Sequence, residues 1–554
     1  MTMATRTRRS DVKVMALPFP LGGIDRSGPF QIQPRRGQMA TTISGFNVRS
    51  YDALAGRLRG GSRYGLNRYI DAQVSGSNLI QGLDVIVGAG YTPPGGTTQT
   101  SQSGRVVSLV AISQGKGFVA DAGGTAWTAI TNDTGQTTPL KTTGPIFSAA
   151  NQQRLYFIDS ANKVYYDPSD NKFKSWATTS GDFPKDTSDR YPRLIATYRG
   201  RTVLSGLEGD NHNWFMSAVN DPADWEYSPT TTTASQAVAG NNSRLGKIGD
   251  MVTCLIAYSD DRLIIGGDST IWIMSDDPMD GGRLDLLTDA IGMMWGAPWA
   301  KDPAGTIYFV SNGTGIYMMP PNGQPQRISY QIDEMIAAIN SGTKLVRLLW
   351  NDRHQGLHVF ITTTAEATVT DTHYYWEQRT GAWWRDNFDD KNMNPLACCT
   401  MDGNRPNDRV ALIGSWDGYV RAIDPDAIDD DDKPIKSEVW IGPLVRSGLS
   451  ELKLKDLEAV LALNPTDYSD DLAALMTVDR PTFEQKVTYA IHVGDTAEEA
   501  FNSKAVLTGT WKAGRNTFSP IHRSGEAVYI RLTASKPWAL ESIRGSLIDR
   551  GAAR

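Results

Sequence analysis

The chain has 554 residues, more than one hydrophobic core holds, and its 40% hydrophobic and 9% aromatic content excludes wholesale disorder. The net charge of −6 is uneven: residues 1–70 carry twelve Lys and Arg against three Asp and Glu, so the remainder stands at −15. The three cysteines, Cys254, Cys398 and Cys399, form no CxxC pair, which excludes a disulfide framework and favours a reducing compartment.

Residues 1–75 form the first predicted segment, a basic arm. Pro18, Pro20, Pro29 and Pro34 exclude helix interiors from its first half, and an Arg/Gly-rich stretch follows from residue 40 to 69. The segment has few apolar positions of its own. We therefore expect an extended arm with one or two strands that lies on another part of the protein. The first ten residues are basic but lack an apolar core, so they do not resemble a secretory signal, and no stretch approaches the ~18 apolar residues of a membrane helix.

Residues 76–430 repeat one pattern: a short apolar strand, a turn rich in Gly, Asn or Asp, and a second strand rich in aromatic or β-branched residues. The repeats recur about every 40–60 residues, which is the period of propeller blades. They lie at 117–127, 154–166, 201–216, 262–273, 306–317, 356–376 and 409–420. A lone hairpin cannot bury both faces, whereas blades stacked around an axis can. The pattern predicts a β-propeller of six to seven blades, with an array of β-sandwiches as the alternative.

The last segment, residues 435–554, follows a run of acidic residues, Asp429 to Asp432, and Pro434. Residues 438–441, 487–493 and 527–532 have strand patterns, while 456–463 is ambiguous between helix and strand. We expect a small antiparallel β domain. The whole chain is thus predicted to be all-β.

Two groups of residues are candidate metal sites. His354 and His358 are four residues apart, but in a strand this spacing places them too far apart to bind one metal ion. The run Asp429 to Asp432 has carboxylates that Ca²⁺ prefers, but it lacks the spacing and the glycine of an EF-hand loop, and a solvated linker is the simpler interpretation. The sequence therefore predicts no metal ion and no cofactor.

Catalytic motifs are also missing from the sequence. There is no GxxxxGK[ST] phosphate loop, no GxSxG nucleophile elbow and no HExxH. Asp121 to Trp127 and Ser415 to Gly418 resemble the aspartate-box turn of sialidases only faintly, since Asp and Gly are common turn residues. We predict that the protein is not an enzyme and does not cleave polysaccharide or peptidoglycan. The pair Trp383 and Trp384 is expected in a core rather than on a sugar-binding surface.

The Arg/Gly-rich stretch contains Arg49, Arg57, Arg59 and Arg63. Arginine beside tyrosine can stack on nucleic acid, and it can equally form bidentate bridges to acidic protein surfaces. The composition alone leaves both possibilities open.

This stretch resembles the N-terminal signature of tail nozzle, or tail-hub, proteins of short-tailed bacteriophages, the tail tubular proteins that stabilise packaged DNA. The signature is a strand ending in Asn-Val-Arg, followed by Asp-x-x-x-Gly-Arg-x-Arg-Gly-Gly-x-Arg-x-Gly-Leu. The matching positions are Asn47, Val48, Arg49, Asp52, Gly56, Arg57, Arg59, Gly60, Gly61, Arg63, Gly65 and Leu66. Shorter resemblances lie at 198–225, 263–273 and 538–544.

The resemblance implies a structural virion protein of the viral tail, made in the host cytoplasm, with a basic arm and a C-terminal β platform that build a homohexameric ring. The ring would attach below the adaptor of the portal and hold fibres, spikes or a needle. It would retain packaged double-stranded DNA and conduct it, without sequence recognition, during ejection and virus entry into the host cell. The alternative is a receptor-binding, glycan-binding or glycan-cleaving propeller of a phage tail.

The four arginines are the candidate assembly residues. We expect the arm to pack with the C-terminal domain as a ring platform, with Arg57, Arg59 and Arg63 facing acidic groups of the same ring or of the adaptor. On this hypothesis, alanine at these three positions leaves a folded monomer with an intact propeller but impairs ring formation or adaptor docking.

Overall fold

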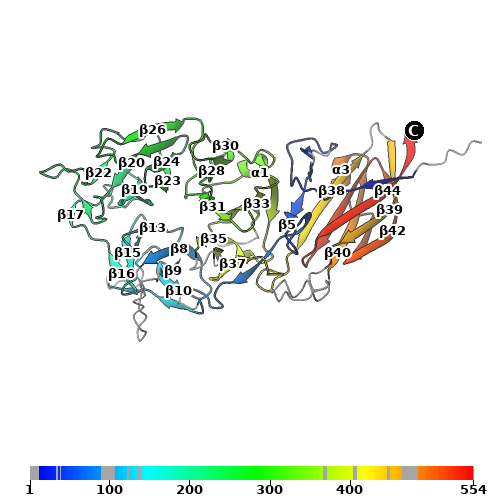
Figure 1. Ribbon diagram of the computed structural model, residues 1–554, viewed down its shortest axis with the longest axis horizontal. Coiled ribbons are helices and arrows are strands. Elements are labelled where there is room, and N and C mark those ends of the chain that lie inside the picture. Colours follow the sequence, from blue (N-terminus) through cyan, green and yellow to red (C-terminus); the bar gives the residue numbers. More distant parts are fainter. Residues whose placement is uncertain are drawn as a thin grey trace, which may run out of the picture.

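Short antiparallel strands dominate the computed structural model, which describes residues 12–32, 35–37, 39–88, 106–120, 124–133, 139–365, 371–402, 409–445, 450–463 and 485–552. They form two bodies along the long axis of the molecule, a propeller and a β-sandwich, with the N-terminal arm between them (Figure 1). The all-β prediction is therefore confirmed. Among the described residues, none of the helices combines the length and apolar character needed to span a bilayer.

Within the residues that the structure describes, the propeller has seven blades, each built on four antiparallel strands. The innermost strands all line one cavity at the axis. In blade order they are β8 (Ile80–Gly88), β13 (Phe147–Asn151), β18 (Leu194–Tyr198), β23 (Val252–Ser259), β27 (Trp299–Lys301), β31 (Lys344–Asn351) and β35 (Pro395–Met401). The ring closes where β35 lies against β8. The structure is therefore one closed propeller and not an array of separate sandwiches. Its seven blades lie within the predicted range of six to seven.

The other three strands of each blade follow outward in the same order. The second strands are β9 (Val106–Ser113), β14 (Arg154–Ile158), β19 (Arg201–Leu207), β24 (Arg262–Gly267), β28 (Ile307–Ser311), β32 (Gly356–Thr363) and β36 (Val410–Ser415). The third are β10 (Lys116–Ala120), β15 (Lys163–Asp167), β20 (Asp210–Met216), β25 (Ile271–Ser275), β29 (Gly315–Met319), β33 (His373–Glu377) and β37 (Val420–Asp424). The outermost are β11 (Trp127–Ala129), β16 (Lys172–Ser175), β22 (Val238–Ala239), β26 (Arg283–Thr288), β30 (Gln326–Arg327), β34 (Ala382–Asp386) and β7 (Gly65–Arg68).

Local sequence explains the hairpins. Two-residue turns with positive φ at both positions match the twist of antiparallel strands. Such turns join β9 to β10, β13 to β14 and β18 to β19, through Gln114–Gly115, Gln152–Gln153 and Arg199–Gly200. Neighbouring blades then bury their apolar faces against each other, as Leu155 and Phe157 of the second blade do against Ile112 of the first. The blades stabilise one another in the ring, because both neighbours contribute side chains to the apolar core between them.

The seventh blade joins the two ends of the propeller. Its outermost strand, β7, comes from the segment predicted as arm and pairs antiparallel with β37, with Leu66 opposite Ile423. The propeller therefore begins at residue 65 and not near residue 76. Such a strand from the distant N-terminal side fastens the ring by backbone hydrogen bonds.

The C-terminal body is a sandwich of two antiparallel sheets. One sheet has the order β4-β38-β43-β40-β41 and the other β1-β44-β39-β42. Their strands are β1 (Val12–Ala16), β4 (Gly45–Phe46), β38 (Ser437–Val445), β39 (Ser450–Leu461), β40 (Lys486–Gly494), β41 (Leu507–Lys512), β42 (Gly514–Gly525), β43 (Ala527–Ala534) and β44 (Leu540–Ala552). The ambiguous stretch at 456–463 is thus mainly strand, because β39 pairs on both sides.

The arm supplies strands to both bodies. β1 pairs with β44, and β4 pairs antiparallel with β38 and parallel with β34 of the sixth blade, which fuses that blade and the sandwich into one nine-stranded sheet. The prediction that the arm packs with the C-terminal domain is confirmed. Smaller elements are β2 (Arg35–Arg36), β3 (Met39–Ala40), β5 (Val48–Tyr51), β6 (Leu58–Ser62), β12 (Thr131–Asn132), β17 (Ser180–Gly181), β21 (Asp224–Trp225), helices α1 (Asp333–Ala337) and α3 (Ala497–Asn502), and a 3₁₀ turn at Lys391–Met393.

One continuous apolar core runs from the sixth blade through the arm into the sandwich. Phe19 of the arm lies between Trp384 of the propeller and Trp538 of the sandwich, with ring centroids 5.9 Å and 6.2 Å away. Trp383 and Trp384 are both fully buried, which confirms the prediction that this pair packs in a core. Each such aromatic ring buries ~150–250 Å². The junction between the bodies is therefore a hydrophobic interior and not a flexible linker.

Candidate functional site

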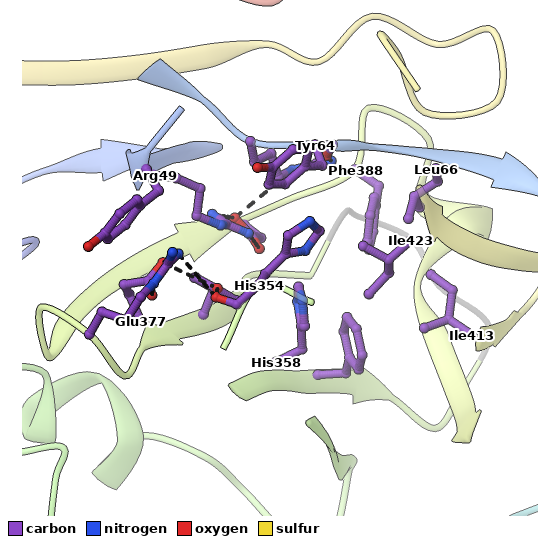
Figure 2. Close-up of a pocket in the computed structure, with 15 residues that line it drawn as sticks. Arg49, Tyr64, Leu66, His354, His358, Glu377, Phe388, Ile413 and Ile423 are labelled. Atoms are coloured by element: carbon purple, nitrogen blue, oxygen red, sulfur yellow. Dashed lines mark hydrogen bonds and ion pairs between the residues drawn. The ribbon is translucent and has the colours of Figure 1, made fainter. Parts of the chain in front are cut away.

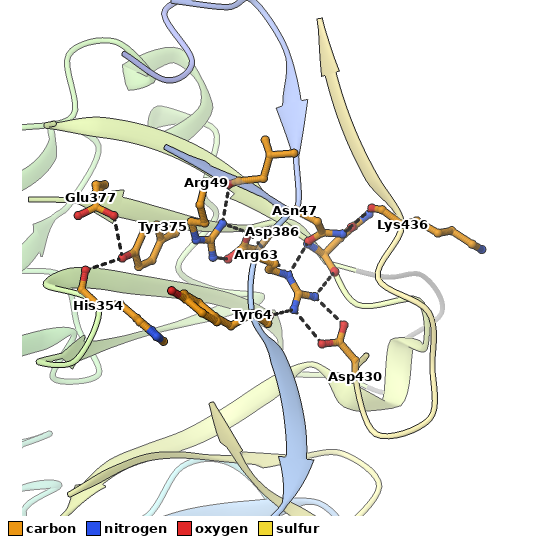
Figure 3. A network of polar contacts seen from close by, with 12 residues as sticks. Asn47, Arg49, Arg63, Tyr64, His354, Tyr375, Glu377, Asp386, Asp430 and Lys436 are labelled. Carbon is orange, nitrogen blue, oxygen red and sulfur yellow. Dashed lines mark hydrogen bonds and ion pairs between the residues drawn. The ribbon is translucent and has the colours of Figure 1, made fainter. Parts of the chain in front are cut away.

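The candidate site is the junction where the arm meets the sixth blade and the loop after β37. Arg49 lies on β5 and Arg63 directly after β6, and both side chains are buried (Figure 3). A buried charge is expensive unless it is paired and hydrogen-bonded. The partners of these two guanidinium groups therefore show which parts of the chain the signature residues of the arm hold together.

Arg49 forms a bidentate ion pair with Asp386 at the end of β34. The distances are 2.7 Å from Nη1 to Oδ1 and 2.6 Å from Nη2 to Oδ2. The guanidinium also stacks over the ring of Tyr375, 4.0 Å from its centroid. Burial alone would raise the pKa of Asp386, but the positive charges of Arg49 and Arg63 outweigh it and hold that pKa below its ordinary value. The arm is thus held to the sixth blade by a desolvated ion pair.

Arg63 forms a second bidentate pair, with Asp430. Its Nη1 lies 2.8 Å from Oδ1 and its Nη2 2.6 Å from Oδ2. The Nε donates to Oδ1 of Asn47 at 2.9 Å, and Nη2 also donates to the carbonyl of Asn387 at 3.2 Å. The planar five-donor fork of arginine is what allows one side chain to bind three segments in this way. Arg63 therefore joins the arm, the sixth blade and the loop before the sandwich.

Arg59 and Arg57 lie at the sandwich side of the arm. Arg59 is buried, pairs with Asp52 at 2.9 Å and also bonds Glu541 at the start of β44. The carboxylate of Asp52 accepts the N–H groups of Leu54, Ala55 and Arg57, so it shapes the turn between β5 and β6. Arg57 reaches Glu541 at 3.3 Å, and its side chain is 59% exposed.

The four predicted assembly arginines therefore divide into two kinds. Arg49, Arg59 and Arg63 are buried on carboxylates of their own chain, whereas Arg57 is largely exposed. The expectation that alanine at positions 57, 59 and 63 together leaves a folded monomer stays a prediction, and the pairs of Arg59 and Arg63 within their own chain argue against it. Arg57 remains available to a neighbouring molecule.

The acidic run does not form a solvated linker. Asp430 is buried against Arg63, and Asp431 pairs with both Arg68 and Arg421, at 2.8 Å and 2.7 Å. The interpretation as a linker is corrected for these two carboxylates, since each neutralises an arginine of the propeller or of the arm. No group of three or more His, Cys, Asp or Glu side chains suited to a metal ion occurs in the part of the chain that the structure describes.

A small, partly open cavity of about 30 Å³ lies beside these pairs (Figure 2). His354 and His358 both line it, and within the described residues neither Nε2 atom has a hydrogen-bond partner. The ring of His354 stacks on Tyr64 with centroids 3.9 Å apart. Burial lowers the pKa of each histidine to about 3, so both rings are neutral at pH 7. The space suits a water molecule or two, which need roughly 10–15 Å³ each.

The two histidines line the same cavity, although they do not both lie on one strand as the sequence predicted. His358 is on β32, but His354 precedes it in a turn where Gln355 has a φ of +49°. The turn directs both side chains to one cavity. Nearby guanidinium groups, among them Arg49 and Arg379, still oppose a bound cation.

Two glycines of the arm explain why the signature needs glycine. A Cβ at Gly60 would lie 2.1 Å from the ring of Phe19, and φ is +81° there. A Cβ at Gly61 would lie 2.2 Å from the carbonyl oxygen of Trp538. Only glycine permits this close approach. The two residues bring the arm into backbone contact with the sandwich.

Several partners in this junction were missed by sequence reasoning. Asp386, Asp430 and Asn387 hold the two buried arginines but lie more than 300 residues away along the chain. The sequence signal for these pairs is the uneven charge. Because the arm is strongly basic and the rest of the chain is acidic, ion pairs between them are expected in the folded protein. Asn47 was noted in the signature, and it binds Arg63 through its side-chain oxygen.

No family model and no curated protein matches this chain. Among solved structures, it is similar to YCF48 bound to D1 peptide, with 10% identity over 64% of this chain and 95% of that one, at a TM-score of 0.36. It is also similar to the extracellular domain of the putative hybrid two component system BT4673 from B. thetaiotaomicron, with 13% identity over 83% of this chain and 55% of that one, at a TM-score of 0.42. These likenesses concern β-propeller architecture and nothing finer.

Proposed function

We propose that this protein is a structural subunit of the tail nozzle ring of a short-tailed bacteriophage. One observation carries the proposal: the residues of the nozzle-like signature are those that fasten the arm between propeller and sandwich. Arg49 and Arg63 make buried bidentate pairs, Asp52 shapes the turn, and Gly60 and Gly61 allow backbone contact with the sandwich. A signature whose residues hold two bodies of one chain together is typical of a structural protein rather than of an enzyme.

The charge distribution supports passage of DNA without binding. The chain has a net charge of −6, and Arg49, Arg59 and Arg63 of the arm are each paired with a buried carboxylate of the same chain. Protein that neutralises few phosphates binds DNA weakly, and a negative wall repels it. In a ring of such subunits the genome moves past the wall without adhering to it.

The sandwich offers a surface for assembly. Strand β1 is at the end of its sheet, and Val12, Val14 and Met15 on it are 48%, 69% and 43% exposed. Exposed apolar edge strands promote pairing with another chain. Six copies joined through their sandwiches would place the propellers on the outside of the ring, where fibres, spikes or a needle attach. The adaptor below the portal would contact the ring from above.

Native mass spectrometry and negative-stain electron microscopy of the purified protein, alone and mixed with the adaptor of the same virus, test this proposal. We expect rings of six subunits, formed alone or on the adaptor. A protein that stays monomeric in both conditions contradicts the proposal. Release of reducing sugar from host surface polysaccharide by the purified protein contradicts the non-catalytic role.

A further inference from the structure

The axis of the propeller contains a cavity of about 390 Å³ that is separate from the junction described above. All seven innermost strands contribute to its wall. Cavities that bind small molecules in proteins are typically about 300–1,000 Å³, mostly apolar, with a few polar groups. This cavity has the size of such a site, and apolar residue types predominate among the residues that line it.

The side chain of Arg347 crosses this cavity from β31. It donates to the carbonyl of Gly296 from Nη1 at 2.7 Å and to that of Leu396 from Nε at 3.3 Å. Its guanidinium carbon lies 4.9 Å from the ring centroid of Phe147, which stands on β13, three blades away around the ring. The positive charge is thus held near the middle of the cavity.

The guanidinium of Arg347 lacks a close anion. Within the described residues, no carboxylate lies within the 4.0 Å of an ion pair, in contrast to Arg49, Arg59 and Arg63. Cys398 and then Asp84 of β8 have a weaker, opposing electrostatic effect on its pKa than burial has, and the Asp84 carboxyl is hydrogen-bonded by Ser148. Burial lowers the pKa of Arg347, which reflects the cost of an uncompensated charge. An anion bound here would offset that cost.

Large apolar side chains also contribute to the wall of the cavity. They are Leu83, Ile146, Ile195, Leu255, Trp299 and Leu348. Such a surface favours the hydrocarbon part of a ligand, at about 25 cal/mol for each Å² removed from water. Anions without an apolar part, such as sulfate, would gain nothing from it.

We infer that the axial cavity binds a small amphipathic carboxylate, with its carboxylate on Arg347 and its hydrocarbon part against the apolar wall. The planar guanidinium can donate two parallel hydrogen bonds to one carboxylate, as those of Arg49 and Arg63 do elsewhere in this chain. The inference goes beyond the role as a ring subunit and does not depend on it, because the site lies within one propeller.

Asp84 gives the site a pH dependence. Burial raises the pKa of its carboxyl to about 6 despite the hydrogen bond from Ser148 and the charge of Arg347. Cys398 and Cys399 of β35 also interact electrostatically with it, and burial raises the thiol pKa of each, so both stay neutral. Below about pH 6 the carboxyl of Asp84 is neutral and no longer repels a bound anion, so binding tightens as the pH falls.

Isothermal titration calorimetry with sodium benzoate as the probe tests the inference, with benzamide as the neutral analogue of the same shape. Benzoate should bind the wild-type protein and benzamide should not. Arg347→Met keeps the apolar volume and removes the charge, so it should weaken benzoate binding about tenfold or more. Arg283→Met on β26 is the matched control outside the cavity and should leave binding unchanged. Benzoate should also bind more tightly at pH 5.5 than at pH 7.5.

Ala150→Phe provides a second variant in case Arg347→Met does not fold, since Ala150 lines the cavity without contributing a hydrogen-bonding side chain. The larger ring should fill the space and block benzoate while Arg347 is intact. Equal affinity of the wild type and both variants overturns the inference, and so does the absence of benzoate binding to the wild type. Binding of benzamide as tight as that of benzoate overturns the assigned role of the guanidinium.

Discussion

Arg63 and Asp430 face each other in a buried bidentate ion pair, although 367 residues separate them in the sequence. The pair connects the end of an arm strand to the loop that leads from the propeller into the sandwich. Both side chains are at most 4% exposed, so neither charge has water as an alternative partner.

Replacing Arg63 by Ala should therefore destabilise the protein strongly, because it leaves the Asp430 carboxylate buried and unpaired. Loss of one partner of a buried pair costs about 3–5 kcal/mol. Arg57→Ala is the control, since exposed pairs contribute only about 0–1 kcal/mol. Denaturant unfolding measures both. In the double variant Arg63→Ala/Asp430→Ala, the loss should be smaller than the sum of the two single losses. Equal effects at positions 57 and 63 would show that the pair does not support the junction.

A second prediction concerns the close approach of the arm to the sandwich. Gly61→Ala should loosen the arm, because the new Cβ would lie 2.2 Å from the carbonyl oxygen of Trp538. Gly249→Ala is the matched control, as nothing lies within 4 Å of its Cβ position and its φ is not in the left-handed region. Limited proteolysis should cut the arm of the Gly61 variant much faster than that of wild type or control. Unchanged cleavage would mean that the backbone adjusts at no cost.

The two cavity histidines predict a loss of stability in acid. Their folded-state pKa of about 3 lies below the ordinary value of 6.5, so the unfolded chain binds more protons. Their contribution is complete above about pH 6.5 and declines as the pH falls toward 3, by about 1.4 kcal/mol per pH unit for each histidine. His354→Gln/His358→Gln should flatten the decline of the melting temperature between pH 6.5 and 4.5. His212→Gln, at an exposed position, should not.

A fourth prediction separates assembly from folding. Val12→Lys/Val14→Lys places two charges on the exposed edge strand β1 and should reduce ring formation in native mass spectrometry. The melting temperature of the monomer should change little. Leu286→Lys adds a charge at a similarly exposed apolar position on β26 of the propeller, 47% exposed, and should leave assembly intact. Normal rings from the β1 variant would exclude this strand from the subunit contact.

Much of the propeller could be predicted from sequence because its hairpins are local. Each turn and both flanking strands lie within about 15 residues, so their pattern is visible without tertiary information. Strand β7 was assigned to the arm instead, since it has only four residues and its partner β37 lies some 350 residues later. A strand that short is defined by its pairing and not by its composition.

The site was harder to predict for a related reason. The arginines of the arm were recognised, but an arginine in a sequence does not show whether its carboxylate belongs to the same chain. Asp430 lies in a run of aspartates that has the composition of a solvated segment, yet it is 1% exposed. The prediction for His354 assumed that it lies on a strand with His358, whereas a turn at Gln355 changes the direction of its side chain. In each case the folded structure, and not the local composition, determines where the side chain lies.

The nine-stranded sheet has a mechanical consequence. The sixth blade and the sandwich share β4, whose neighbours are bonded through the backbone: Asn47 N–H donates to the carbonyl of Arg385 at 2.8 Å, and Trp440 N–H donates to that of Ser44 at 3.2 Å. A load applied at the rim of the propeller is therefore transmitted to the sandwich through hydrogen bonds under shear, with the pairs of Arg49 and Arg63 in parallel. We therefore expect the two bodies to tilt together, because bending at the junction would break these backbone hydrogen bonds and the buried ion pairs.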